Sequence, residues 1–132
     1  MSRVLVVEDD HAIRTVIVQA LRRAGYEVAA VDTLAALDQA LGSGTPDVLV
    51  SDVKLPDGDG LEHLSLIAAR CPGLPVIILS AQNTLTTAVR AAEAGAYDYL
   101  PKPFDLDALV RAVAGAAGRS TCLLYTSDAA DE

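Results

Sequence analysis

The chain has 132 residues, of which 52% are hydrophobic, and its 10 basic and 18 acidic side chains give a formal net charge of −8. This length suits one compact domain, and the apolar content excludes a disordered chain. The basic residues are scattered and outnumbered by acidic ones, so we expect no binding of nucleic acid by this domain.

Short apolar runs alternate five times with apolar residues at helical spacing. In chain order, the predicted elements are a strand at 4–7, a helix at 11–24, a strand at 26–31, a helix at 34–41, a strand at 48–50, a helix at 61–68, a strand at 76–79, a helix at 85–92, a strand at 97–100 and a helix at 106–113. Five strand–helix units predict an α/β fold with a parallel sheet covered by helices on both faces. The strands lack alternation, which predicts burial on both sides.

No apolar run approaches the roughly 20 residues of a membrane span, so we expect no membrane contact. The first strand begins at about Arg3, which leaves no room for a signal peptide. Cys71 and Cys122 lie far apart, and we expect Cys71 to be a buried free thiol of a reducing compartment. We therefore predict a cytoplasmic protein.

The last residues of the chain change character. Residues 119–132 continue no strand or helix pattern, and we expect them to be a linker or an artificial tail. Residues 1–118 form the predicted domain, which by itself carries a net charge of −6. The acidic balance therefore belongs to the domain.

Polar side chains stand directly after four of the predicted strands. The acidic residues 8–10 follow the first strand, Asp52 the third, Ser80 the fourth and Lys102 the fifth. In a parallel sheet these positions meet at one edge, where open α/β sheets bind ligands. Carboxylates that lie close repel one another unless a cation lies among them, and hard oxygen ligands suit Mg²⁺. The pattern predicts a divalent cation and a phosphoryl group meeting at a carboxylate.

These residues differ in how strongly they indicate a site. We expect Asp9 and Asp52 to act there, and Asp10 and Asp47 to be ordinary loop or helix-cap carboxylates. Ser80 can either hydrogen-bond a phosphoryl oxygen or simply end its strand, and the neighbouring carboxylates favour the first role.

Lys102 lies between two prolines just past the fifth strand. A lysine there offers a point charge for a phosphoryl oxygen. The flanking prolines favour a rigid turn, which a cis Lys102–Pro103 bond would suit.

A second acidic stretch, Asp57-Gly58-Asp59-Gly60, looks like part of an EF-hand loop. With Gly60 at the sixth position of that loop, the first and twelfth positions are Leu55 and Leu66, which cannot supply the required oxygen ligands. We therefore interpret the stretch as a turn. The glycine-rich phosphate loops of nucleotide-binding proteins have no counterpart in the sequence, and His11 and His63 lack metal-ligand spacing.

Four motifs, in this order, resemble the receiver domain of bacterial two-component response regulators. They are Val7-Glu8-Asp9-Asp10, Ser51 to Gly60, Ser80-Ala81 and Tyr99 to Phe104. The resemblance covers residues 3–117 and implies a flavodoxin-like (βα)5 fold, whose five-stranded parallel sheet has the order 2-1-3-4-5. Residues 80–84 and 95–105 add a closer likeness to the NtrC group of nitrogen regulators.

The resemblance implies a role for each residue of the site. Asp52 would be the phosphoacceptor. The ligands of Mg²⁺ would be Asp9, Asp52, the backbone carbonyl of Lys54 and, through a water molecule, Glu8. The metal would cancel charge that otherwise repels the incoming phosphoryl group.

The resemblance also implies a switch. Lys102 and the Ser80 hydroxyl would bind phosphoryl oxygens once the group has been transferred. Their movement would shift the loop after the fourth strand and let Tyr99 turn inward, so Ser80 and Tyr99 are the expected switch residues. The output surface would be the face of the fourth helix, the fifth strand and the fifth helix.

The implied partner is a sensor histidine kinase, whose phosphohistidine supplies the phosphoryl group. The chain would be a signalling switch rather than an enzyme, catalysing only its own phosphoryl transfer and slow dephosphorylation. Its own output domain, which these 132 residues do not include, would control transcription. Phosphorylation would favour a homodimer.

Two other functions use similar residues. A phosphatase of the haloacid-dehalogenase type also has an aspartate nucleophile and Mg²⁺. It needs a second aspartate two residues later, where Lys54 stands, and normally carries its nucleophile after the first strand. A receiver that serves only as an interaction module would lack Asp9, Asp52 or Lys102, and all three are present. Both alternatives are therefore disfavoured.

Overall fold

The computed structural model describes residues 2–81 and 84–121. In chain order the elements are β1 (Arg3–Val7), α1 (His11–Arg23), β2 (Glu27–Val31), α2 (Leu34–Ser43), β3 (Val48–Asp52), β4 (Lys54–Leu55), β5 (Gly58–Asp59), α3 (Gly60–Arg70), β6 (Val76–Ser80), α4 (Leu85–Glu93), β7 (Asp98–Pro101) and α5 (Leu106–Thr121). Every predicted strand and helix forms. The short strands β4 and β5, which pair as an antiparallel hairpin, are additional.

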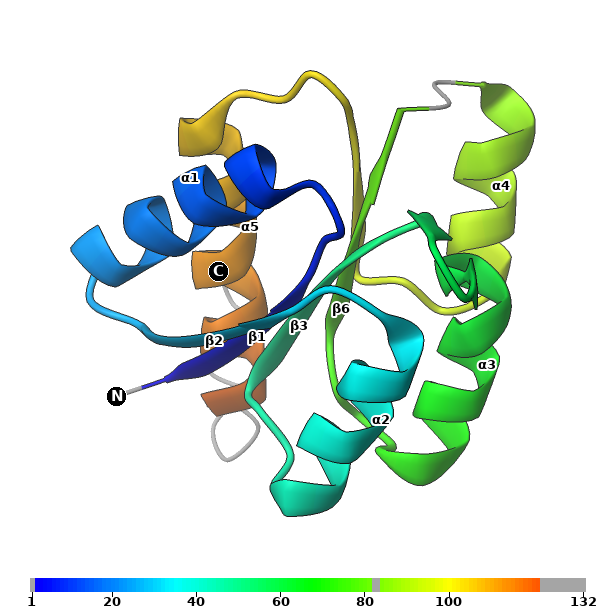
Figure 1. Cartoon of the computed structure of the whole chain (residues 1–132), viewed down its shortest axis with the longest axis horizontal. Coiled ribbons are helices and arrows are strands. Elements are labelled where there is room, and N and C mark those ends of the chain that lie inside the picture. The colour runs from blue at the N-terminus through cyan, green and yellow to red at the C-terminus, as the bar shows by residue number, and fades with distance from the viewer. Residues whose placement is uncertain (1, 82–83, 122–132) are drawn as a thin grey trace, which may run out of the picture.

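Five strands form one parallel sheet in the order β2-β1-β3-β6-β7 (Figure 1). Counted without the small hairpin, this order is 2-1-3-4-5, which confirms the predicted topology. The register places Val7 beside Ser51, and Ser80 beside Pro101. The carboxyl ends of these strands therefore lie at one edge of the sheet.

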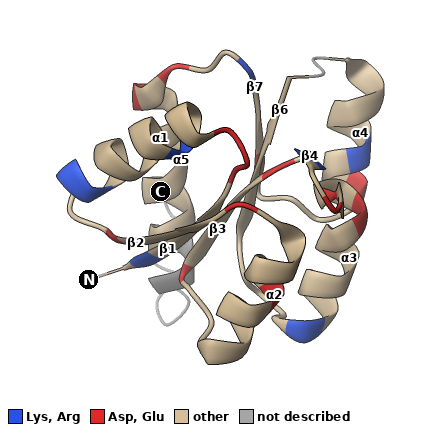
Figure 2. Cartoon of the chain, in the orientation of Figure 1, with Lys and Arg blue, Asp and Glu red and all other residues tan. Residues whose placement is uncertain are grey.

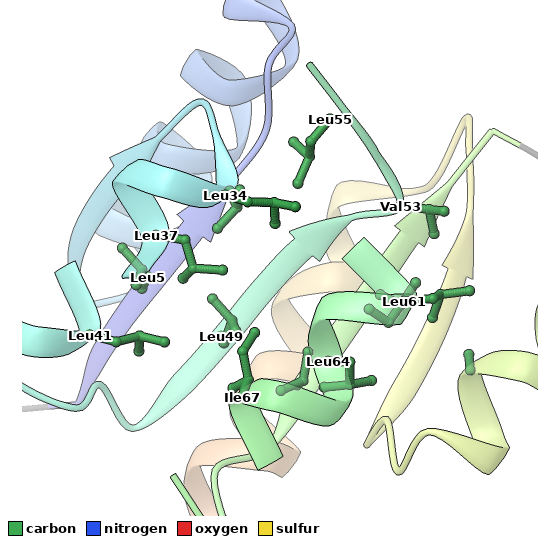
Figure 3. Close-up of a cluster of buried hydrophobic side chains, with 14 residues drawn as sticks. Leu5, Leu34, Leu37, Leu41, Leu49, Val53, Leu55, Leu61, Leu64 and Ile67 are labelled. Carbon is green, nitrogen blue, oxygen red and sulfur yellow. The ribbon is translucent and has the colours of Figure 1, made fainter. Parts of the chain in front are cut away.

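Helices cover both faces of the sheet, with α1 and α5 on one side and α2, α3 and α4 on the other (Figure 1). In β1, Leu5 and Val7 contribute to the core beneath α2 and α3, whereas Val4 and Val6 contribute to the core beneath α1 and α5. Burial on both faces explains why the central strands have apolar runs without alternation. Figure 3 shows the first of these cores.

The edge strands are less buried than the sequence predicted. Ala29 and Ala30 of β2 are exposed, and β7 has no fully buried residue. The expectation of burial on both sides is therefore wrong for β2 and β7. Each of these strands has a neighbouring strand on one side alone, so the helices cover it incompletely.

Several local details differ from the predictions or extend them. Helix α2 continues to Ser43 and is capped by Gly44, and α5 continues to Thr121. The Lys102–Pro103 bond is cis, as expected. Cys71 is a free thiol but only half-buried, because it caps the carboxyl end of α3 at the periphery of the domain. Residues 119–121 of the predicted tail continue α5 instead, and residues 122–132 lie outside the described residues, so the predicted linker or artificial tail stays a prediction.

Within residues 2–81 and 84–121, no helix has the length and apolar character needed to cross a membrane.

Candidate functional site

The carboxyl edge of the sheet gathers the predicted site residues. Figure 2 shows acidic segments at the ends of β1 and β3 and a basic segment at the end of β7. Glu8, Asp9 and Asp52 each place one carboxylate oxygen within 4.8 Å of the others. Glu8 and Asp52 are buried, whereas Asp9 is exposed at the rim. The structure therefore brings together the three carboxylates that the sequence predicted.

Lys102 is part of the same cluster. Its Nζ donates to Glu8 Oε1 at 2.8 Å and to Asp52 Oδ2 at 3.0 Å. The lysine was predicted at this site, but its bridge between two carboxylates was not. Two buried carboxylates beside each other need a positive charge, and here the ammonium group supplies it.

Burial and ion pairing act in opposite directions on Lys102. Burial disfavours its charge, but hydrogen bonds from its ammonium group to Glu8 and Asp52 outweigh that effect and raise the pKa of Lys102 above its usual value. The lysine therefore stays charged across the physiological pH range.

Burial dominates at Glu8 and raises the pKa of this carboxyl group to about 7. The nearby charge of Asp52 raises it further, while hydrogen bonds from Lys102 and from the Asp10 amide oppose the shift. Glu8 consequently titrates near neutral pH when no metal is bound.

The raised pKa of Glu8 predicts a pH-dependent stability. A protonated Glu8 is favoured in the folded protein, because the group has its ordinary pKa of 4.5 in the unfolded chain. This contribution is full below about pH 4.5 and is lost as the pH rises to about 7. Urea unfolding without divalent cations gives the free energy of unfolding of the wild type and of Glu8→Gln. As the pH rises over this interval, we expect the wild type to lose stability relative to the variant. A difference that does not vary with pH would contradict the assignment.

The backbone of Glu8 is also held in place. Its N–H donates to Val31 O at 3.0 Å, and its carbonyl accepts from Arg14 Nη1 at 2.8 Å. Glu8 Oε2 accepts the Asp10 amide at 3.1 Å, while the Asp10 carboxylate caps α1 by accepting the N–H groups of residues 12 and 13. Asp10 is thus a helix cap, as predicted. No sequence pattern indicates a role for Arg14, because its partner is a backbone carbonyl.

Asp52 is positioned by the segments around it. Its Oδ1 accepts the Val53 amide at 2.8 Å, and the Ser51 hydroxyl donates to its carbonyl at 3.0 Å. Gly60, the first residue of α3, donates its N–H to Val53 O at 2.6 Å. A Cβ at position 60 would overlap the Asp52 carbonyl oxygen. Glycine is needed here because the start of α3 lies directly against the backbone of the proposed phosphoacceptor.

Asp57 links the loop after β4 to the start of α2. Its two carboxylate oxygens accept the N–H groups of Leu34 and Ala35 at 2.9 and 3.0 Å. Thr33 caps the same helix by accepting the Ala36 amide. The predicted turn at residues 57–60 therefore also caps a helix that lies 22 or 23 positions earlier in the chain.

We expect Asp57→Ala to lower the urea midpoint of unfolding, because two amides at the start of α2 lose their acceptor. Bonds from Leu34 and then Ala35 hold the pKa of Asp57 below its usual 3.8. The stabilisation is therefore present above about pH 3.8 and is lost as the pH falls through the lower folded-state value. Asp57→Asn keeps one oxygen acceptor and should have an intermediate midpoint. Equal midpoints for all three proteins at pH 7 would contradict this role.

The two predicted switch residues lie on neighbouring strands. Ser80 is buried at the end of β6, and its carbonyl accepts the Lys102 amide at 2.7 Å. Tyr99 pairs with Ile78 in the sheet register and packs, half-buried, against the core beneath α2 and α3. Lys54 is exposed and follows Asp52 by two positions. The roles predicted for these residues stay predictions.

Each histidine ring contacts a charged side chain. His11 Nδ1 lies 3.1 Å from Arg14 Nη2, and His63 Nε2 lies 2.8 Å from Asp38 Oδ1. Within residues 2–81 and 84–121, the carboxylate cluster consists of Glu8, Asp9 and Asp52 and includes neither histidine.

A doubly wound parallel sheet with buried carboxylates and a lysine at its carboxyl edge defines a class of ligand-binding α/β domain. Comparison with known families narrows this class. The family described as "Response regulator receiver domain" matches residues 4–114. The chain belongs to this family, and it is a phosphoacceptor receiver of two-component signalling. The phosphatase alternative is thereby removed.

Known proteins with similar sequences and structures place the chain among NtrC-type receivers. It is 50% identical over 109 residues to the DNA-binding transcriptional regulator NtrC of Rhizobium meliloti (strain 1021), covering 83% of this chain and 22% of that protein. It is 48% identical to NtrC of Azospirillum brasilense, covering 91% and 25% of the two chains. The solution structure of the beryllofluoride-activated NtrC4 receiver domain dimer has a TM-score of 0.86 at 32% identity and covers 91% and 99% of the two chains. The chain spans about a quarter of the length of the two NtrC proteins, from Rhizobium meliloti and Azospirillum brasilense.

Proposed function

We propose that Asp52 accepts a phosphoryl group from a phosphohistidine of a sensor histidine kinase. One observation carries the proposal: Asp52 is the carboxylate that lies against Glu8, Asp9 and Lys102 at the carboxyl edge of the sheet. Its neighbours supply metal-ligating oxygens and a cationic group for phosphoryl oxygens.

The donor set fits Mg²⁺. Three carboxylate oxygens lie within 4.8 Å of one another, and hard oxygen ligands with room for water are what this ion requires. Asp9, Asp52 and the Lys54 carbonyl would hold the ion directly, with Glu8 acting through a water molecule. When bound, Mg²⁺ offsets negative charge on the carboxylates and on the phosphoryl oxygens.

The transfer is an in-line displacement at phosphorus. An oxygen of Asp52 forms the new O–P bond while the P–N bond to the imidazole breaks, and the imidazole nitrogen keeps the electron pair. Lys102, which is shared between Glu8 and Asp52 before transfer, turns its ammonium group to a phosphoryl oxygen. The Ser80 hydroxyl donates to another of these oxygens. The same residues would then favour the slow hydrolysis of the acyl phosphate.

The phosphoryl group adds about −1.5 to −2 charges and strong acceptors beside β6 and β7. Movement of Ser80 and Lys102 toward it would shift the loop that precedes α4, with Tyr99 turning inward. The expected output surface is formed by α4, β7 and α5, where Leu85 is 80% exposed and Val89 is 44% exposed. Exposed apolar side chains on one helix support a binding surface, and a homodimer is the proposed phosphorylated form. The NtrC4 receiver, for comparison, is described as a dimer when activated by beryllofluoride.

In the full-length protein this surface would control a transcription-regulating output domain, because the relatives at about 50% identity are DNA-binding transcriptional regulators. The free thiol of Cys71 supports the cytoplasm as the compartment.

The test is phosphoryl uptake by the wild-type chain from acetyl phosphate. We expect intact-mass spectrometry to detect one added phosphoryl group with Mg²⁺ and none when a chelator removes the metal. No uptake under either condition, together with no binding of beryllofluoride, would overturn the proposed function.

A further inference from the structure

We propose that Arg14 is a positioning residue for the acidic cluster. Through its bond to the Glu8 carbonyl it keeps the loop between β1 and α1 in the arrangement that a divalent cation needs. The proposal rests on the proposed function in one respect, namely that the cluster formed by Glu8, Asp9 and Asp52 is the cation site.

The side chain of Arg14 reaches back from the first turns of α1 to the end of β1. Its backbone N–H donates to Asp10 O at 2.9 Å, which places the residue in the helix, and its Nη1 donates to Glu8 O at 2.8 Å. Its Nη2 lies 3.1 Å from His11 Nδ1. The guanidinium group is planar and carries several donors in a rigid fork. The contact with His11 therefore helps to fix the direction of the bond to the Glu8 carbonyl.

Arg14 completes a set of four contacts around Glu8. The other three are the bond from the Glu8 N–H to Val31 O, the bond from Lys102 to Oε1 and the bond from the Asp10 amide to Oε2. The bond from Arg14 ties the Glu8 carbonyl to α1, and this carbonyl begins the peptide link to Asp9. Loss of the bond would leave a partly buried carbonyl without this partner and would loosen the peptide that carries the exposed cation ligand.

Charge and position have opposite effects at this site, which makes the proposal testable. Arg14 is a cation next to a cluster that is proposed to bind another cation. If Arg14 acted only through its charge, Arg14→Ala would strengthen Mg²⁺ binding. If Arg14 positions the loop, the same variant weakens binding, by about tenfold for loss of a partner that orients metal ligands.

Arg22→Ala is the matched control. Arg22 belongs to the same helix and also donates to a backbone carbonyl, Val28 O, at 3.2 Å, but it lies at the opposite end of α1 from the cluster. Like Arg14→Ala, the Arg22→Ala substitution removes one positive charge and one hydrogen bond to a backbone carbonyl. We expect it to leave the affinity for Mg²⁺ unchanged.

The experiment measures the dissociation constant for Mg²⁺ by calorimetry in the wild type, Arg14→Ala, Arg14→Lys and Arg22→Ala. It also measures amide exchange at residues 8 and 10 in the metal-free proteins. We expect weaker binding and faster exchange in Arg14→Ala alone among the alanine variants. Arg14→Lys keeps the charge without the fork, so it should also bind Mg²⁺ less tightly than wild type, and it serves if the alanine variant does not fold.

Unchanged or tighter Mg²⁺ binding by both Arg14 variants would overturn the proposal, as would unchanged exchange at residues 8 and 10. Failure of the wild type to bind Mg²⁺ would instead count against the proposed function. The exchange comparison needs no metal, so it still decides whether Arg14 positions the loop.

Discussion

Asp52→Asn is expected to abolish phosphoryl uptake from acetyl phosphate in the presence of Mg²⁺. The amide has nearly the same shape as the carboxylate, and its one oxygen can still accept from Val53. It is uncharged, its NH2 group cannot accept from Lys102, and it is a poor nucleophile toward phosphorus. We expect a loss of at least about 1,000-fold in the uptake rate, as when a nucleophile is removed from other active sites. Intact-mass spectrometry over a time course measures the change.

Asp47→Asn provides a control for charge removal. Asp47 precedes β3, at the opposite end from Asp52, and accepts the Arg3 amide at 2.8 Å. This variant should take up the phosphoryl group at the wild-type rate. Continued uptake by Asp52→Asn would show that another carboxylate, with exposed Asp9 the first candidate, is the acceptor.

Gly60→Ala is expected to impair both folding and phosphoryl uptake. The added Cβ would overlap the carbonyl oxygen of Asp52, which is backbone and cannot move aside as a flexible side chain could. Either α3 or the end of β3 must shift, at a cost of about 2 kcal/mol or more in the free energy of unfolding. Such a shift also displaces the Asp52 carboxylate and slows transfer, because reaction geometry tolerates little misplacement.

Gly42→Ala is the matched comparison for this change. Gly42 lies in α2, and a Cβ there would meet no atom within 4 Å. Alanine is more favourable than glycine by roughly 0.5–1 kcal/mol in the middle of a helix, so in the last turn of α2 this variant should be at least as stable as wild type. Urea unfolding at neutral pH measures both variants. Equal stability of Gly60→Ala and Gly42→Ala would contradict the close approach at position 60.

Much of the fold could be predicted because the signals are local. Apolar residues at helical spacing and helix caps such as Thr33 define a helix, and the residues that form each signal are only a few positions apart. Polar residues that follow apolar runs, such as Asp52 and Ser80, can be assigned to one edge of the sheet when the strands are parallel. The order of the strands, in contrast, came from the family resemblance and not from any periodicity.

Other features were missed or wrong because they depend on the surroundings of a residue. The exposure of Ala29 and Ala30 follows from the position of β2 at the sheet edge, which its apolar sequence does not reveal. Cys71 was expected in the core but lies at a helix end. A local pattern cannot distinguish these positions, since burial is a property of the packed layers.

The apolar pattern of the chain is enough to place the five main strands and the five helices approximately, and to identify the chemical groups at the strand ends, because these are local properties. The bridge from Lys102 to Glu8, 94 positions away, and to Asp52, 50 positions away, depends on how the chain folds. The capping of α2 by Asp57 depends on the fold in the same way. Hydrogen bonds and ion pairs act over about 3 Å. Their partners are therefore set by how the layers pack and where each side chain points, whereas hydrophobic periodicity is a property of residues that are close in the sequence.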